Sequence, residues 1–190
     1  DLVAFVDADV TPPDGWLDPL LAHFGDPHVA AVAPRVRGRA GGNSTIDRYE
    51  RHRSPLDLGP EAARVVPGGR VSYVPTACVV FRRSVLDDLG GFDETLRFGE
   101  DVDLVWSTAE QRTIRYEPAV EVVHDNRPDW AALVRQRVQY GSSAAHLDQR
   151  HPGQVAPVEV NVWSLAAWAL GSLGGRTGIV AGVGTASMSA

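Results

Sequence analysis

Apolar residues recur along the chain with two spacings, and these predict its secondary structure. Short continuous apolar runs bounded by Gly, Pro or Asp are typical of strands covered on both faces. Apolar residues three or four apart are typical of helices that bury one face. The runs predict extended chain at 2–6, 29–36, 71–81 and 113–124, and the helical spacing predicts helices at 15–24, 46–53, 84–89, 101–111 and 129–147. Strands that alternate with helices favour an α/β layer architecture.

Two stretches depart from this pattern. Residues 37–70 are rich in Arg, Gly and Pro, so we expect a long functional excursion that contains one helical piece. Residues 162–190 hold a single charge, and their most apolar part is shorter than the about 20 residues that cross a bilayer. An interfacial helix, the start of a membrane segment and a disordered tail all stay open there. We expect one domain at 1–150 and an apolar extension at 151–190.

Composition limits the classes of function. The chain has 190 residues, 44 % of them apolar, which is enough for one sizeable core. Its net charge of −6 excludes a nucleic-acid partner held by bulk charge. All 18 basic residues are Arg, so no mechanism that requires a lysine is available. The single cysteine, Cys78, lies in an apolar run and is expected to be a buried structural thiol, which fits a reducing cytoplasm.

The first candidate site follows the first apolar run. Residues 2–6 predict a buried strand, and Asp7-Ala8-Asp9 stands at its end. Two neighbouring carboxylates there need a cation, and a divalent metal that also holds a phosphate suits their hard oxygen ligands. The same letters, up to Thr11, also match the Asp-x-Asp-x-Thr pattern of haloacid-dehalogenase-like phosphatases, which would make Asp7 a nucleophile. Both interpretations stay open on this motif alone.

A second cluster favours one of them. Gly90-Gly91-Phe92-Asp93-Glu94 is followed, after a short gap, by Gly99-Glu100-Asp101-Val102-Asp103 at the expected start of a helix. Together with residues 5–9 and Trp16-Leu17, this set resembles the family 2 glycosyltransferases of the GT-A (Rossmann-like) fold over about 150 residues. The resemblance implies that the chain is the C-terminal catalytic and acceptor-binding part of that fold. It also implies that the N-terminal nucleotide-binding strands are missing, which would leave strand 2–6 with an unpaired side.

The resemblance also implies roles for particular residues. Asp101 is the implied general base for the acceptor hydroxyl, with inversion at the sugar carbon. Asp7, Asp9 and His124 are the implied ligands of Mg²⁺ or Mn²⁺, with Asp9 and His124 roughly 4–6 Å apart. Further donor- and acceptor-binding residues are Glu100, Asp93, Gly91, Gln136 and Tyr140. Gln139 and Tyr140 replace the Arg and Trp of processive members, so synthesis of long chains is not expected.

A narrower resemblance concerns the C-terminal third. Residues 140–145, 150–153, 156–157 and 163–164 are similar to the mycofactocin-system members of family 2. This implies UDP-glucose as donor, a small peptide-derived acceptor, and a cytoplasmic protein at the inner face of the membrane, in contact through its C-terminal region. A catalytically inactive carbohydrate-binding domain is the remaining alternative, although the intact acidic motifs argue against it.

Overall fold

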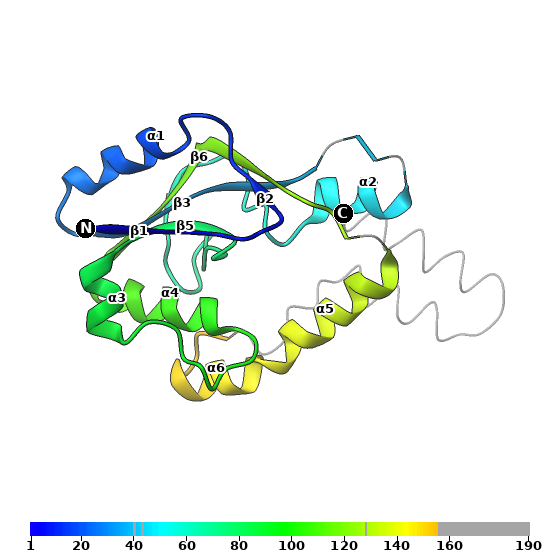
Figure 1. Ribbon diagram of the computed structural model, residues 1–190. Coiled ribbons are helices and arrows are strands. Elements are labelled where there is room, and N and C mark those ends of the chain that lie inside the picture. The colour runs from blue at the N-terminus through cyan, green and yellow to red at the C-terminus, as the bar shows by residue number, and fades with distance from the viewer. Residues whose placement is uncertain (40, 43, 128, 156–190) are drawn as a thin grey trace. The chain divides into compact units, whose positions relative to one another are not determined.

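A computed structural model describes residues 1–39, 41–42, 44–127 and 129–155 (Figure 1). This part of the chain forms a mixed six-stranded sheet with helices on both faces. The strands are β1 (Leu2–Val6), β2 (Val10–Thr11), β3 (Val29–Gly38), β4 (Ala63–Arg64), β5 (Cys78–Arg82) and β6 (Thr113–His124). The helices are α1 (Leu17–Ala22), the 3-10 helix η1 (His23–Gly25), α2 (Thr45–Arg53), α3 (Arg83–Leu89), α4 (Glu100–Gln111), α5 (Trp130–Ser142) and α6 (Ala144–Arg150). The predicted α/β class is confirmed.

The sheet has the order β1-β5-β3-β6-β2, and β4 pairs with β6 beside this path. β3 and β6 run parallel, whereas every other pair of neighbouring strands in the described part of the chain is antiparallel. Parallel strands end at the same edge of a sheet, so Gly38 and His124 lie opposite each other there. This edge carries most of the acidic residues discussed below.

The centre of the sheet is buried on both faces, which explains the unbroken apolar run of β3. Val32 points to one face and packs with Leu20 of α1, while Ala31 points to the other and packs with Leu104 of α4. Figure 1 shows the same division, with α1 above the sheet and α3, α4 and α6 below it. A strand between two helical layers needs apolar residues at every position.

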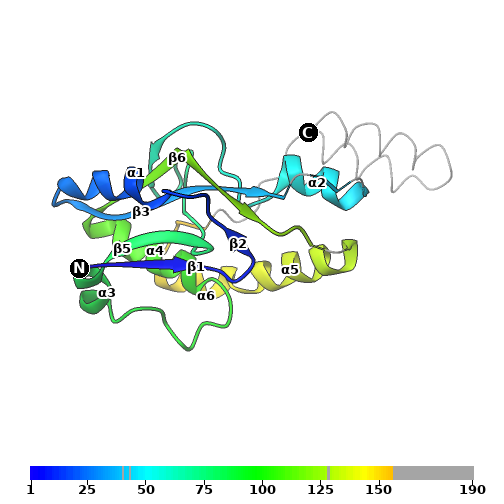
Figure 2. The same ribbon diagram turned by 45° about the horizontal axis from the view of Figure 1, so that its top comes forward.

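β1 differs from its prediction. It has a single neighbour, β5, and forms one edge of the described sheet (Figure 2). Leu2, Ala4 and Val6 are exposed, and Val3 and Phe5 are only partly buried. The prediction of a buried strand at 2–6 was therefore wrong for this chain, because one open edge and one open face leave these side chains in contact with solvent. The predicted unpaired side is present.

Three further boundaries differ from the prediction. The helix predicted at 129–147 is two helices that meet at Ser143. Strand β5 begins only at Cys78 within the predicted 71–81, because Pro75 interrupts the extended chain. The two-residue strands β2 and β4 are too short to show a periodic pattern, so the sequence did not predict them.

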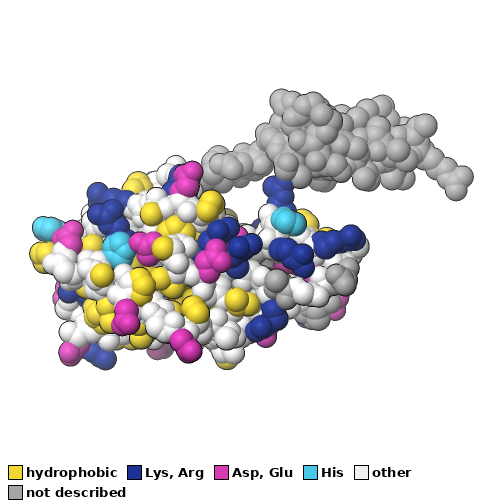
Figure 3. Space-filling model, turned by 90° about the horizontal axis from the view of Figure 1, so that it is seen from above, with side chains coloured by type: hydrophobic (Ala, Val, Ile, Leu, Met, Phe, Trp, Pro, Cys, Tyr) yellow, Lys and Arg dark blue, Asp and Glu magenta, His cyan; other side chains and the backbone are white. Residues whose placement is uncertain are grey.

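The excursion at 37–70 contains the predicted helix, which is α2. Ser44 begins it with a capping box, in which the Ser44 hydroxyl accepts from the Asp47 N–H at 3.1 Å and Asp47 accepts from the Ser44 N–H at 3.2 Å. Its exposed surface is basic through Arg48, His52 and Arg53, and basic side chains gather over this part of the molecule in Figure 3. The helix expected within 37–70 is therefore confirmed, and a functional role for this excursion stays a prediction.

Residues 1–155 form one compact unit. The domain boundary predicted at 150 stays a prediction, because the larger part of 151–190 lies outside the described residues. The three interpretations of 162–190 lie outside them as well. Among the described residues, no helix combines the length and the apolar character needed to span a bilayer.

Candidate functional site

The segment between β1 and β2 carries both carboxylates of the Asp-x-Asp motif. Asp7 follows β1 directly, and its backbone N–H donates to the Ala77 carbonyl at 2.9 Å. Asp9 precedes β2, which pairs with the end of β6 so that Val10 lies opposite His124. As a result the Asp9 Oδ2 and His124 Nε2 atoms are 3.3 Å apart. This separation is shorter than the roughly 4–6 Å expected from the sequence.

Asp7 is electrostatically linked to this pair. Partial burial raises the pKa of Asp7 above its ordinary value, and the neighbouring Asp9 carboxylate raises it further. His124 acts in the opposite direction and lowers the Asp7 pKa. A carboxylate whose pKa is raised by a neighbouring carboxylate favours a cation nearby, because a positive charge removes the repulsion.

Glu100 and Asp101 begin helix α4, directly after Gly99. Gly99 has a φ of 82°, and a Cβ on it would lie 2.8 Å from the Cβ of Ser143, so only glycine allows the helix to start here. Burial raises the pKa of Asp101, whereas the N–H of Val102, which donates to Asp101 Oδ1 at 2.8 Å, lowers it. Glu100 and Asp7 raise it again. A carboxylate with a raised pKa is better suited to accept a proton than an ordinary surface carboxylate.

One cleft of about 470 Å³ brings most of the predicted site residues together. Seven of the nine line it, namely Asp7, Asp9, Glu100, Asp101, His124, Gln136 and Tyr140. Gln136 and Tyr140 come from α5, where Gln136 Nε2 donates to the Tyr140 hydroxyl at 2.8 Å. Their position in this cleft agrees with the predicted binding roles, and the roles themselves stay predictions.

The cleft contains buried polar atoms without a partner in the described part of the chain. These are Glu100 Oε2, Asn126 Oδ1 and Gln136 Oε1. A buried polar atom that lacks a hydrogen bond costs about 1–3 kcal/mol, so each atom favours a polar ligand. Asn126 and Arg127 were not predicted as site residues. Their position immediately after His124, at the same strand end, is the signal that could have indicated them.

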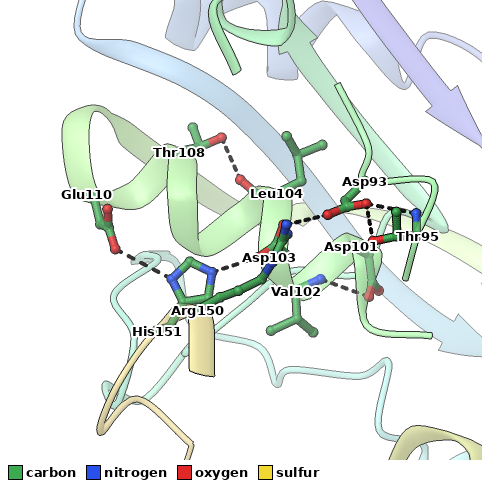
Figure 4. Close-up of polar contacts among 10 residues, drawn as sticks. All are labelled: Asp93, Thr95, Asp101, Val102, Asp103, Leu104, Thr108, Glu110, Arg150 and His151. Atoms are coloured by element: carbon green, nitrogen blue, oxygen red, sulfur yellow. Dashed lines mark hydrogen bonds and ion pairs between the residues drawn. The ribbon is translucent and has the colours of Figure 1, made fainter. Parts of the chain in front are cut away.

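Gly91 and Asp93 lie elsewhere. They line a separate hollow that includes Asp103, Arg150 and His151 and does not include Asp7, Asp9 or Asp101. Asp93 Oδ1 accepts from the Thr95 N–H at 2.7 Å, and its other oxygen pairs with Arg150 (Figure 4). The structure thus does not bring these two predicted binding residues to the cleft.

The same hollow contains a charged cluster that ties α6 to α4. Asp103 accepts from Arg150 Nη1 at 2.7 Å and is 2.9 Å from His151 Nε2, while the other ring nitrogen of His151 faces Glu110 Oε1 at 3.5 Å (Figure 4). Asp103 and His151 are both buried. Asp103 lies two residues after Asp101, so this cluster fixes the first turn of the helix that carries the implied base.

An apolar pocket of about 240 Å³ adjoins the cleft at Asp101. Its wall combines aromatic and aliphatic side chains, including Tyr73, Trp106 and Leu147, and it shares Asp101 and Tyr140 with the cleft. Burial raises the pKa of Tyr73 to about 12, so its phenol is neutral. Trp106 is buried, and its Nε1 donates to the Ser72 carbonyl at 2.8 Å.

The donor set suits a divalent metal in part. Two ligand atoms at about 2.1 Å from one octahedral ion and at right angles to each other are about 3.0 Å apart. The 3.3 Å between Asp9 and His124 is close to that separation. No group of three or more His, Cys, Asp or Glu side chains in the described residues converges closely enough to hold a metal, so Asp7 does not complete the set in this arrangement.

Comparison with known proteins identifies the family. Residues 1–90 match the sequence model described as Glycosyl transferase family 2. The chain is 48 % identical over 182 residues to the Pre-mycofactocin glycosyltransferase of two Mycobacterium tuberculosis strains, which covers 95 % of the chain and 39 % of the relative. It is 31 % identical over 143 residues to the O-antigen biosynthesis protein RfbC of Myxococcus xanthus, covering 63 % of the chain and 11 % of that protein. The chain therefore spans well under half the length of these relatives. It belongs to glycosyl transferase family 2, as its acidic motifs predict.

Proposed function

We propose that the protein containing this chain transfers a sugar from a nucleotide-diphosphate sugar to an acceptor hydroxyl, with inversion at the sugar carbon. One observation carries the proposal: Asp101, a half-buried carboxylate with a raised pKa, lines the same cleft as the Asp9–His124 pair. A displacement of this kind needs a base for the acceptor and positive charge for the leaving diphosphate. Asp101 supplies the base, and the Asp9–His124 pair can hold a cation that supplies the positive charge.

Asp7, Asp9 and His124 would hold Mg²⁺ or Mn²⁺ in this proposal. Asp9 and His124 fit two neighbouring coordination positions, and Asp7 has to approach them when the ion and the diphosphate bind. Carboxylate oxygens and one imidazole suit Mn²⁺ better than Ca²⁺. The bound ion would supply positive charge to the leaving diphosphate.

The names of the relatives support a proposal for the acceptor, and the resemblance of the C-terminal third to the same group supports one for the donor. Because the most similar relatives that we report are named Pre-mycofactocin glycosyltransferase, we propose a mycofactocin precursor as acceptor and UDP-glucose as donor. The apolar pocket beside Asp101 supports an acceptor whose body is less polar than a sugar. We further propose that the protein works at the inner face of the membrane, for which the support is the apolar sequence around Trp163 and Trp168.

The phosphatase alternative needs a basic residue beside Asp7 to hold the phosphoryl group, and because the chain has no lysine, this residue would be an arginine. The charged groups that shift the Asp7 pKa are instead Asp9 and His124, and Asp7 in turn raises the pKa of Asp101. Together with membership of glycosyl transferase family 2, this arrangement argues against phosphoryl transfer through an aspartyl nucleophile.

The variant Asp101→Asn tests the proposal. Donor binding should persist, and transfer should fall at least about 100-fold, the usual effect of losing a general base. Asp88→Asn, at an exposed position of α3, is the matched control and should keep full transfer. Mass spectrometry of the product with several nucleotide sugars measures both activity and donor choice. Near-normal turnover of Asp101→Asn would remove Asp101 from its role, and wild-type protein that transfers no sugar would favour the carbohydrate-binding alternative.

A further inference from the structure

The acidic residues of the cleft give it a negative charge that opposes the binding of an anionic donor. Its lining includes Asp7, Asp9, Glu100 and Asp101, together with Asp125, which pairs with Arg39. A nucleotide diphosphate is itself an anion and is repelled by such a surface. Among the described residues that line the cleft, one arginine is present, and it is Arg127.

Arg127 is held in place by a buried carboxylate from a distant part of the chain. The backbone N–H of Arg127 donates to Glu50 Oε2 at 2.7 Å, and its Nη1 donates to Glu50 Oε1 at 2.7 Å. Glu50 lies in α2 and is 2 % exposed, while the Arg127 side chain is 13 % exposed. Both oxygens of Glu50 are thus used to fix the main chain and the side chain of one residue.

The neighbouring residue is fixed by the same region. Asn126 Nδ2 donates to the Arg39 carbonyl at 3.0 Å and to Asp47 Oδ1 of α2 at 3.3 Å. The Oδ1 of Asn126 is one of the unpartnered polar atoms of the cleft. Helix α2 therefore acts as a support for the segment that follows His124.

The charge of Arg127 reaches the cleft despite its pairing with Glu50. Arg127 lowers the pKa of Tyr140, although burial raises that pKa overall. A buried ion pair adds little net stability, because desolvation of both charges offsets their attraction. Stability alone is therefore a weak reason for an arginine at this position.

We propose that Arg127 binds the diphosphate of the nucleotide-sugar donor, and that Glu50 is a positioning residue that holds it there. The planar guanidinium can form two parallel hydrogen bonds to phosphate oxygens, and its charge reduces the repulsion of the donor by the carboxylates that line the cleft. A lysine could not replace Arg127, because its ammonium group is a point charge and cannot form hydrogen bonds to Glu50 and to a phosphate in one plane. The inference rests on the proposed function, since it assigns a ligand of the same cleft.

A double-mutant cycle separates ligand binding from structural support. The variants Arg127→Gln, Glu50→Gln and the double variant are made in the protein that contains this chain. UDP binding is measured by calorimetry with and without Mn²⁺, and stability is measured by urea unfolding. Arg127→Gln should weaken UDP binding about 10- to 100-fold, the usual effect of a lost charged hydrogen bond. The double variant should recover stability, because no buried charge is left unpaired, and should still bind UDP weakly.

Arg35→Gln is the matched control. Arg35 is also largely buried, and it binds both oxygens of Asp57 at 2.7 and 2.9 Å, but it does not line the cleft. It should lower stability and leave UDP binding unchanged. Folded Arg127→Gln that binds UDP as tightly as wild type, or a double variant that regains binding, would overturn the inference. If the wild-type protein that contains this chain binds no nucleoside diphosphate at all, the proposed function itself fails, so the two failures are distinguishable.

Discussion

Gly99 offers the sharpest test of how the fold positions the implied base. Its φ of 82° is close to the 78° of Gly90, so alanine introduces similar backbone strain at both positions, about 1–2 kcal/mol. Only at Gly99 does the new Cβ collide, at 2.8 Å from the Ser143 Cβ and 3.2 Å from Leu147 Cδ1. At Gly90 nothing lies within 4 Å. The two glycines thus form a matched pair that differs in packing alone.

Gly99→Ala should therefore destabilise the protein more than Gly90→Ala. Overpacking of this kind costs about 1–3 kcal/mol, so about 2 kcal/mol separates the variants. For a protein of this size that difference lowers the melting temperature by about 4–8 °C. Thermal unfolding followed by circular dichroism measures it, and transfer rates measured below both transitions should fall further for Gly99→Ala, because Glu100 and Asp101 follow directly.

A second-site change checks the cause. Ser143→Gly removes both atoms nearest to the new methyl group, so Gly99→Ala should cost less in that background than in wild type. Equal melting temperatures for the two alanine variants would refute the packing argument. Unchanged transfer by Gly99→Ala would separate the packing of this turn from the position of Asp101.

Three further results are expected. Arg150→Gln should lose about 2 kcal/mol in urea unfolding, because buried Asp103 then loses one of its two partners, whereas exposed Arg83→Gln should lose almost nothing. Cys78 should resist a thiol reagent in the native protein and react after unfolding, since it is fully buried with a pKa raised to about 12; stoichiometric native labelling would contradict this. Burial raises the pKa of Asp101, so Asp101 stays protonated, and inactive as a base, up to a higher pH than an ordinary Asp. As the pH is lowered, kcat/KM should therefore begin to fall at a pH above the ordinary Asp range, and a profile that is flat down to about pH 4 would exclude this base.

The sequence predicted those features that depend on local pattern and chain order. The alternation of apolar runs with helical spacing was enough for the α/β class, and the strand predicted at 113–124 does end at His124. Cys78 was expected to be buried, and it is fully buried. Each of these properties follows from neighbours within about ten residues.

The features that the sequence did not predict depend on distant partners. Exposure of β1 is decided by which strands lie beside it, and its own apolar letters do not contain that information. The link between Glu50 and Arg127 joins two residues that are 77 positions apart. Asp93 was assigned to the donor or acceptor from its motif, whereas its contact with Arg150 of α6 holds it in another hollow.

Asp7 interacts electrostatically with both parts of the proposed site, the Asp9–His124 pair and Asp101. Its pKa depends on Asp9 and His124 on one side, and its charge raises the pKa of Asp101 on the other. A cation held beside Asp7 would offset that charge, and so would lower the Asp101 pKa and favour the deprotonated base. In this arrangement the proposed base would lose its proton more readily with cation and donor in place than in an empty cleft. The acidic crowding of the cleft is thus consistent with a base whose readiness depends on the bound donor.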